Sequence, residues 1–161
     1  MKFLDDFVAY HKDFTACPET FVRWSGIYAL SCAAGWGHTY RSGNCDYRPN
    51  LWVLLCGESS AKKSTALTTA QSLISQINPD HVAADYYSPA SFIVEMAENP
   101  HRCFVFHEAD VFFRTLDEKN NRPMKPELMK LYDGKVTSKK LRGTEGKGET
   151  HYTELRPGTN G

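Results

Sequence analysis

The stretch LWVLLCGESSAKKSTAL, residues 51–67, constrains the possible folds and functions of this chain more than any other. An apolar run of strand length, LWVLLC, is followed by Gly57, and six positions later by Lys63 and two hydroxyl residues. Phosphate-binding loops have the pattern G-x-x-x-x-G-K-[ST] and connect a buried strand to a helix. The stretch matches this pattern except at the second glycine, where Lys62 stands. It therefore predicts a nucleotide site with an unusual loop.

The chemistry of such a loop assigns a role to each of its residues. Backbone amides and the positive end of the following helix meet the phosphate charge. The lysine reaches the β- and γ-phosphates, and the next hydroxyl holds Mg²⁺. We therefore expect Lys63 to bind the phosphates of ATP and Ser64 to bind Mg²⁺. The expected nucleotide-binding residues are Gly57, Glu58, Ser59, Ser60, Ala61, Lys62, Lys63, Ser64 and Thr65.

A chance match is the alternative, because a glycine six positions before Lys-Ser is a weak pattern by itself. The apolar run before the loop and the helical pattern after it favour the nucleotide site. The missing glycine has a cost, since glycine adopts positive φ freely, whereas Ser60 and Lys62 would do so at about 1–2 kcal/mol each. We expect a changed loop shape or reduced affinity, and tighter binding in Ser60→Gly if Ser60 strains the loop.

The order of predicted elements gives the fold class. Continuous apolar runs suit strands that are covered on both faces, as in parallel sheets. Strands alternating with helices indicate an α/β fold with a P-loop NTPase-like parallel sheet and flanking helices. The elements behind this prediction are strands at 51–56 and 103–110, helices at 62–77 and 124–132, and a hairpin formed by VTSKKLR and THYTEL. A sheet of this kind needs further strands, so we expect a core that is truncated at its C-terminal end.

The first fifty residues predict a helical segment, 1–50, packed on a core formed by residues 51–161. Aromatic residues recur at helical spacing in residues 2–14, and a second helix opens at Pro18 and Glu19. Gly35 and Gly37 are expected to end that helix. The predicted buried stripes are Phe3, Phe7, Tyr10 or His11, and Phe14 in the first helix, and Phe21, Trp24, Tyr28 and Leu30 or Cys32 in the second.

The stretch CFVFHEAD, residues 103–110, is an apolar run that ends in acids. P-loop ATPases carry an aspartate and a glutamate at the end of a second strand, where they orient the magnesium ion and activate the attacking water. Glu108 takes the position of the glutamate, and we expect it to be catalytic. His107 takes the position of the aspartate, and Asp110 is a candidate Mg²⁺ ligand. The alternative is an ordinary solvated strand end.

Positive charges gather in the hairpin near the end of the sequence. A hairpin of this kind can follow a nucleic-acid backbone, although an ordinary charged surface explains the same residues. The candidate nucleic-acid residues are Lys135, Lys139, Lys140 and Arg142.

Composition excludes few classes of protein. Lysine plus arginine and aspartate plus glutamate each number 19 in 161 residues, so global charge does not argue for nucleic acid. No apolar run reaches the length of a membrane span, and the N-terminus has no secretory pattern. The five cysteines form no C-x-x-C pair. We expect a reduced, cytoplasmic protein without a zinc site or a membrane partner.

With these residues in place, the chain resembles a poorly characterised P-loop ATPase domain family of phage, plasmid and other mobile-element proteins, described as primase-associated or helicase-like. The resemblance spans about residues 4–155. It begins with the helical segment PETFVRWSGIYALSCAAG and continues with Tyr47, Pro49, Asn50 and Leu51 before the strand. The loop of the family commonly reads G-x-S-G-A-[RK]-K-[ST], so Lys62 looks like a family variant. The chain departs from the family at Ser60, which replaces a glycine, and at His107.

The resemblance implies a RecA-like or AAA+-like ATPase core that works on DNA, with a homo-oligomeric ring in the full-length protein. Arg142 and Arg156 would then be the candidates for an arginine finger. The function expected is ATP binding and hydrolysis in a helicase-like motor that acts in DNA replication or unwinding on a mobile element. We expect weak hydrolysis by this fragment alone. The alternatives are a P-loop kinase and a nucleotide-gated binding module that does not hydrolyse ATP.

Overall fold

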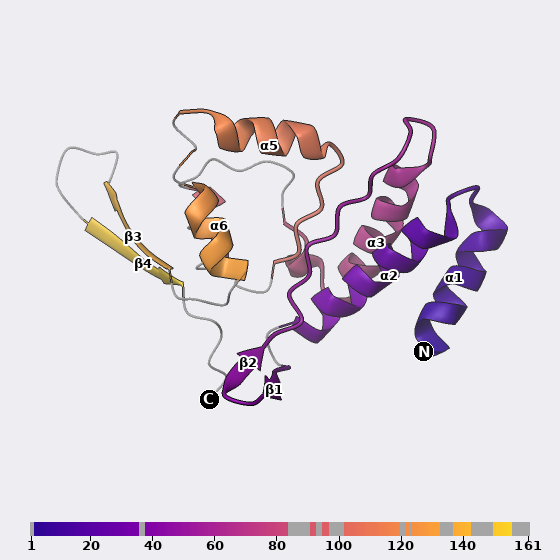
Figure 1. The fold of residues 1–161 in the computed structure, drawn as a ribbon, viewed down its shortest axis with the longest axis horizontal. Helices are drawn as coiled ribbons and strands as arrows, with labels where there is room; N and C mark the ends of the chain where they lie inside the picture. Colours follow the sequence, from indigo (N-terminus) through magenta and orange to yellow (C-terminus); the bar gives the residue numbers. More distant parts are fainter. Residues whose placement is uncertain are drawn as a thin grey trace. The chain divides into compact units, whose positions relative to one another are not determined.

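The computed structural model describes residues 2–35, 38–83, 91–92, 95–96, 102–119, 122, 124–132, 137–142 and 150–155 (Figure 1). The chain forms two compact units. The first unit comprises Met1–Ala83 and Cys103–His107, and the second comprises Ala84–Arg102 and Glu108–Gly161. The candidate phosphate-binding residues 57–65 therefore lie in the first unit, while Glu108 and the basic hairpin belong to the second.

The predicted parallel sheet is wrong. The described residues form five α-helices and two separate antiparallel hairpins of two strands each. The hairpins are β1 (Tyr40–Ser42) with β2 (Cys45–Tyr47), and β3 (Thr137–Arg142) with β4 (Thr150–Leu155). Among the described residues, the only parallel pairing is an isolated bridge between Val82 and Cys103. The architecture is thus mostly helical.

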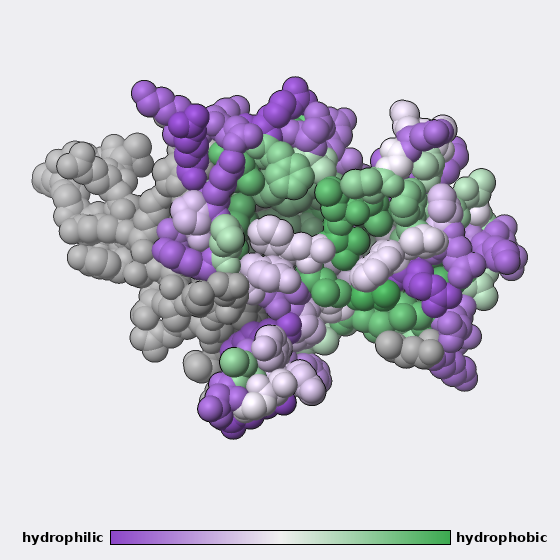
Figure 2. Space-filling view, in the orientation of Figure 1, coloured by the Kyte–Doolittle hydropathy of each residue, from purple (hydrophilic) through white to green (hydrophobic). Residues whose placement is uncertain are grey.

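The apolar run 51–56 forms no strand, although its burial alternates. Val53 and Leu55 are half-buried, whereas Trp52 and Leu54 are 63% and 59% exposed. A strand requires a backbone ladder with a neighbour, and the described residues offer this run none. The second predicted strand contributes only the bridge at Cys103, and that bridge goes to Val82. Figure 2 shows apolar side chains gathered on the face of the first unit that carries this segment.

Three helices build the first unit: α1 (Lys2–Phe14), α2 (Glu19–Ala34) and α3 (Lys63–Ile77). Helix α2 packs against both α1 and α3. Pro18 precedes the first residue of α2, and Gly35 ends the helix with φ of 53°, as the sequence predicts. The 3₁₀ helix η2 (Pro79–His81) follows α3 and leads to Val82 of the parallel bridge.

The buried face of α1 agrees with the predicted one at His11, the alternative to Tyr10, but not at Phe3 and Phe14. Leu4, Val8 and His11 are buried, whereas Tyr10 and Phe14 are 63% and 70% exposed. Phe3 is also exposed, and the exposed rings contact their neighbours along the helix instead of entering the core. In α2, Trp24 is exposed, and the buried residues are Val22, Ser25, Gly26, Ala29 and Cys32. Small residues at these positions allow close approach of the neighbouring helices.

Gly26 sets the distance between α1 and α2. A methyl group placed on Gly26 would lie 2.9 Å from Cδ1 of Phe7 and 3.2 Å from Cδ2 of Leu4. Gly26→Ala gains about 1 kcal/mol of helix propensity, but overpacking costs about 1–3 kcal/mol, so we expect a net loss of stability. Urea unfolding followed by circular dichroism measures the change. A more stable variant would show that the two helices are not in close contact here.

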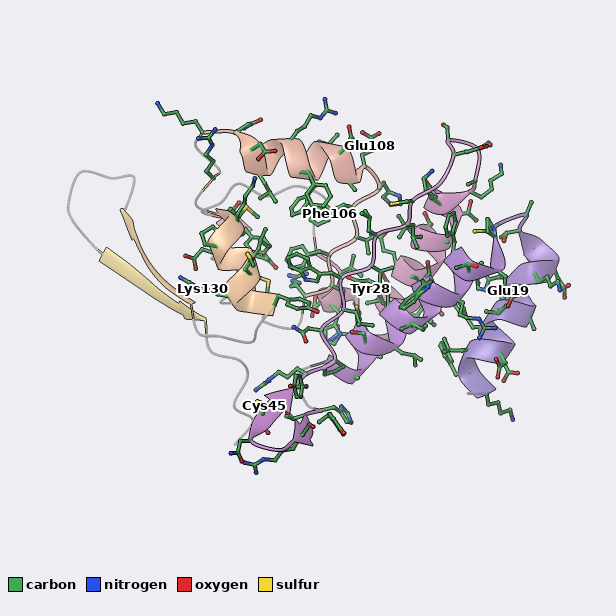
Figure 3. The ribbon with its side chains drawn as sticks, viewed as in Figure 1. Glu19, Tyr28, Cys45, Phe106, Glu108 and Lys130 are labelled. Atoms are coloured by element: carbon green, nitrogen blue, oxygen red, sulfur yellow. The ribbon has the colours of Figure 1, made fainter. Side chains whose placement is uncertain are left out.

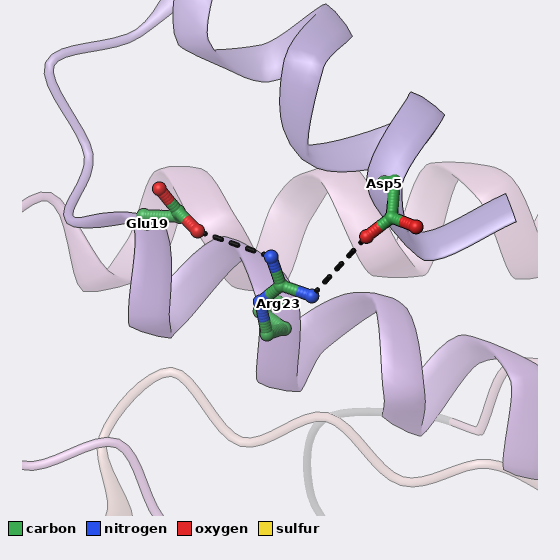
Figure 4. Close-up of polar contacts among 3 residues, drawn as sticks. All are labelled: Asp5, Glu19 and Arg23. Carbon is green, nitrogen blue, oxygen red and sulfur yellow. Dashed lines mark hydrogen bonds and ion pairs between the residues drawn. The ribbon is translucent and has the colours of Figure 1, made fainter. Parts of the chain in front are cut away.

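An ion-pair cluster lies across the same two helices. Arg23 of α2 contacts Glu19 at 3.1 Å, one turn earlier, and Asp5 of α1 at 3.6 Å (Figure 4). The hydrogen bond to Glu19 is the main cause of the raised pKa of Arg23. All three side chains are well exposed, so solvent screens the cluster, and the packing at Gly26 contributes more to stability.

The main core of the first unit lies between α2, α3 and the segment around Cys103. Ala29, Cys32, Ala70, Ile74 and Cys103 form one buried cluster, against which Tyr28, Leu73 and Val82 pack. The hydroxyl of Tyr28 donates a hydrogen bond of 2.7 Å to the carbonyl of Phe104. The inward face predicted for the helix at 62–77 is therefore confirmed at Ala66, Ala70 and Ile74.

The second unit contains α5 (Ala109–Asp117), α6 (Met124–Tyr132) and the β3–β4 hairpin. Both α6 and the hairpin are confirmed predictions. In the hairpin, Thr137 pairs with Leu155 at one end of the ladder, and Arg142 pairs with Thr150 at the other. The sequence prediction missed α5, because the acids after Phe106 were assigned to a strand end. None of the described helices is long and apolar enough to cross a membrane.

Candidate functional site

The predicted loop forms a compact turn between the run 51–56 and helix α3. The amide of Ala61 donates to the carbonyl of Glu58 at 3.1 Å, which closes a turn over Ser59 and Ser60. Helix α3 begins at Lys63, and the carbonyl of Lys62 accepts its first backbone bonds, from Thr65 and Ala66. The expected order of turn, lysine and helix is thus present, although no strand precedes it.

Lys63 folds back over the turn. Its Nζ lies 2.7 Å from the carbonyl oxygen of Gly57 and 2.7 Å from that of Glu58, and it donates a hydrogen bond to each. These two bonds use two of the three donors of the ammonium group, so one donor remains for a ligand. The charge of Lys63 is therefore held beside the first residues of the loop, close to the N-terminus of α3.

Lys62 adopts the backbone conformation that the missing glycine would supply. Its φ of 57° and ψ of 28° lie in the left-handed region, and it is the N-cap residue of α3. Among the described residues other than glycine, Lys62 alone has a positive φ. Lys62 therefore adopts the conformation that glycine would adopt freely, at the energetic cost of a side chain in this region. Ser60 does not have a positive φ, so the condition under which Ser60→Gly was expected to tighten binding is not met.

Two substitutions at position 62 separate backbone strain from charge. Lys62→Gly and Lys62→Ala remove the same charge, but only glycine relieves the left-handed conformation. We expect Lys62→Gly to be more stable than Lys62→Ala by about 1 kcal/mol in denaturant unfolding. Ser60→Gly should give no gain in stability or nucleotide affinity, because Ser60 does not have positive φ. Equal stability of the two Lys62 variants would contradict the strain at this position.

The start of α3 has unpaired backbone donors. Among the described residues, no acceptor bonds the amides of Ser59, Ser60, Lys62, Lys63 or Ser64. The helix has no side-chain cap and no acid in its first turn. Exposed amides at a helix N-terminus attract anions, and the helix dipole adds to that attraction. The loop and the helix start thus offer both the donors and the positive charge that a phosphate group requires.

Neighbouring helices hold the loop in place. A methyl group on Gly57 would lie 3.0 Å from Cζ of Phe21, so this glycine allows the loop to pack against α2. The thiol of Cys17, in the connection between α1 and α2, donates to the carbonyl of Lys62 at 3.5 Å. Burial raises the pKa of Cys17, which keeps this thiol protonated as a donor. The sequence pattern gave no sign of the role of Phe21 and Cys17 as supports for the loop.

The other predicted site residues, Glu108, Asp110 and His107, are exposed at or just before the start of α5. Glu108 is exposed and precedes the first residue of α5 (Figure 3), and no described residue pairs with its carboxylate. Asp110 lies in the first turn of α5, where Arg114 contacts it at 2.7 Å. His107 is exposed. The strand that was expected to carry these residues is absent from the described chain, and Glu108 and Asp110 instead lie at the start of a helix.

The hydroxyl of Ser64 is exposed in the first turn of α3, where a phosphate-bound metal ion could reach it. The described residues contain no group of three or more histidine, cysteine, aspartate or glutamate side chains that could hold a metal ion. A Mg²⁺ ion at Ser64 would therefore depend on nucleotide oxygens and water for most of its ligands.

The candidate nucleic-acid residues fall mainly in one strand. Lys139, Lys140 and Arg142 belong to β3, where they pair with Thr153, Tyr152 and Thr150 of β4. Lys135 and Arg156 lie outside the described residues.

Comparison of the chain with protein-family models, with curated proteins and with solved structures finds no match. The resemblance to the mobile-element ATPases therefore remains a prediction from the residues quoted above.

Proposed function

We propose that residues 57–65 bind the phosphates of a nucleoside triphosphate, with ATP as the expected ligand. The observation that carries this proposal is the position of Lys63, whose Nζ donates to the carbonyls of Gly57 and Glu58. A lysine held at the start of a helix by its own loop places a positive charge beside unpaired amides. This arrangement suits a phosphate chain, because several negative charges must be met at one place.

The conformation of Lys62 supports the same proposal. The pattern of phosphate-binding loops has glycine at this position, and the chain adopts a glycine-like conformation there in spite of the lysine side chain. Strained residues of this kind often mark functional sites. The side chain of Lys62 also adds a second positive charge beside the phosphates, which offsets part of the cost of its conformation.

Hydrolysis is the second part of the proposal. Glu108 would activate the attacking water, and Ser64 would hold Mg²⁺ against the phosphates. Glu108 suits this role better than Asp110 does, because Arg114 already contacts the carboxylate of Asp110. We further propose that the full-length protein couples this activity to DNA as a helicase-like motor, working as a homo-oligomer in the cytoplasm. Lys139, Lys140 and Arg142 of β3 are the candidate DNA contacts.

Titration of the chain with a fluorescent ATP analogue in the presence of Mg²⁺ tests the binding step. We expect saturable binding that unlabelled ATP reverses and that AMP, which lacks the β- and γ-phosphates, reverses poorly. If AMP displaces the analogue as well as ATP does, the chain recognises the base and sugar, and the role of Lys63 is contradicted.

Turnover measured with and without single-stranded DNA then tests the motor. DNA-independent turnover would favour the kinase alternative, and binding without turnover would favour the binding module.

A further inference from the structure

Two of the five cysteines lie together in the core of the first unit. Cys32, near the end of α2, and Cys103, at the parallel bridge, belong to the same buried cluster, and neither forms a disulfide in this structure. Cys32 also lies one turn after Tyr28, whose hydroxyl bonds the carbonyl of Phe104, the residue that follows Cys103. Cys45 and Cys56 are exposed, and Cys17 is half-buried beside the phosphate loop. The pair therefore differs from the other cysteines in having a second sulfur within reach.

The surroundings of the pair make the two sulfurs unequal. The hydrogen bond from Cys103 lowers the pKa of Cys32, against the opposing effect of burial. The same bond to Cys32, together with burial, raises the pKa of Cys103. The thiolate is the nucleophilic form of cysteine, so Cys32 is the sulfur that reacts first with an oxidant.

We propose that Cys32 and Cys103 form a redox modification site, at which hydrogen peroxide joins the two sulfurs in a disulfide. The Cys32 thiolate attacks one peroxide oxygen, the O–O bond breaks, and the leaving hydroxide takes a proton to become water. Cys32 then carries a sulfenic acid. The Cys103 sulfur attacks Sγ of Cys32, the S–O bond breaks, and the second oxygen leaves as water with the thiol proton. Two thiols lose two electrons in total, and one peroxide is reduced to two waters.

The bond would connect segments that are far apart in sequence. Cys32 lies one turn after Tyr28, whose hydroxyl already bonds the carbonyl of Phe104, next to Cys103. The disulfide would thus reinforce an existing contact between α2 and residues 103–107. It would also cross-link the two ends of a long chain segment that includes the whole phosphate loop. The entropy that a disulfide removes from the unfolded state increases with the length of such a segment. This inference is independent of whether the loop binds nucleotide.

Peptide mapping of the wild-type chain tests the proposal without any variant. Native protein is first treated with iodoacetamide, which blocks the exposed Cys45 and Cys56, and then with hydrogen peroxide. The chain is unfolded, remaining thiols are capped with a second alkylating reagent, and trypsin cuts after lysine and arginine. Cys32 and Cys103 then fall in different peptides, 24–41 and 103–114, each without another cysteine. A parallel sample is oxidised in urea as the control.

We expect the linked pair of peptides 24–41 and 103–114 to be the main disulfide product of the folded chain and a minor product in urea. Dithiothreitol should reverse it, and the oxidised chain should melt at least about 5 °C higher than the reduced one. The proposal is overturned if both peptides carry the second alkylating reagent after peroxide treatment, or if Cys32 is recovered as a sulfinic acid without the link. Equal yields of the pair in folded and urea-treated samples would overturn it as well.

Discussion

Replacing Lys63 by alanine should weaken ATP binding by about 100-fold, because a charged donor to phosphate contributes about 1.5–3 kcal/mol, and 1.4 kcal/mol corresponds to tenfold. The variant should keep its fold, since Lys63 lies at the start of α3 and contributes nothing to the buried cluster. Titration with the fluorescent ATP analogue measures the loss of affinity, and circular dichroism checks the fold.

Lys12→Ala is the matched control for this experiment. Lys12 is an exposed lysine near the end of α1, in the same unit, so its loss changes the net charge equally. We expect Lys12→Ala to bind ATP as the wild type does. If the two variants lose affinity equally, the effect comes from overall charge, and the loop is not the site. Unchanged affinity in Lys63→Ala would remove the nucleotide proposal altogether.

Ile74→Ala should destabilise the chain by about 2–5 kcal/mol, the usual cost of truncating a fully buried isoleucine. Ile74 is 1% exposed and lies in the cluster between α2, α3 and Cys103. Lys63 lies in the first turn of α3. When the variant begins to unfold, the position of Lys63 is therefore lost, and ATP binding should weaken as well. Urea unfolding of the variant and the wild type measures the difference in the free energy of unfolding.

Ile77→Ala provides the control on the same helix. Ile77 is 54% exposed at the end of α3, so the same truncation removes little buried surface there. We expect a change within about 0.5 kcal/mol, as for surface positions in general. Similar losses in both variants would mean that α3 does not bury the face that contains Ala66, Ala70 and Ile74.

The sequence predicted helices better than it predicted their buried faces. Pro18 before α2 and Gly35 after it are local signals, and they act wherever the rest of the chain lies. In α1, however, an aromatic stripe and an aliphatic stripe both recur at helical spacing. Gly26 contacts Leu4 and Phe7, one residue from each stripe, whereas Tyr10 and Phe14 remain exposed. The buried face thus depends on a residue of another helix, which periodicity within α1 does not reveal.

The prediction of two buried strands was wrong for a related reason. An apolar run such as LWVLLC indicates burial, but a strand also needs a partner for its amides and carbonyls. The second predicted strand, residues 103–110, contributes only a single bridge, between Cys103 and Val82. Only the β3–β4 hairpin was predicted correctly, because its strands are close in sequence and pair locally.

The loop shows how far a motif predicts geometry. The pattern located the turn, the lysine and the helix start correctly, because each depends on residues within a few positions of the others. It identified the departure from consensus at Lys62, and the strained backbone lies there. It did not identify Phe21 and Cys17, since contacts from residues far away in the sequence leave no local signal. Glu108 was expected at the end of a strand and instead precedes α5.

Amide NMR spectra of the ¹⁵N-labelled wild-type chain, recorded as ATP and Mg²⁺ are added, test the central claim most directly. If residues 57–65 bind the phosphates, the largest shifts should belong to the amides that lack acceptors in the free chain, those of Ser59, Ser60, Lys62, Lys63 and Ser64. Inorganic triphosphate should move the same amides, because it shares only the phosphate chain with ATP. A spectrum that stays unchanged at millimolar ATP, or one whose shifts lie outside the loop and the first turn of α3, would contradict the proposed site.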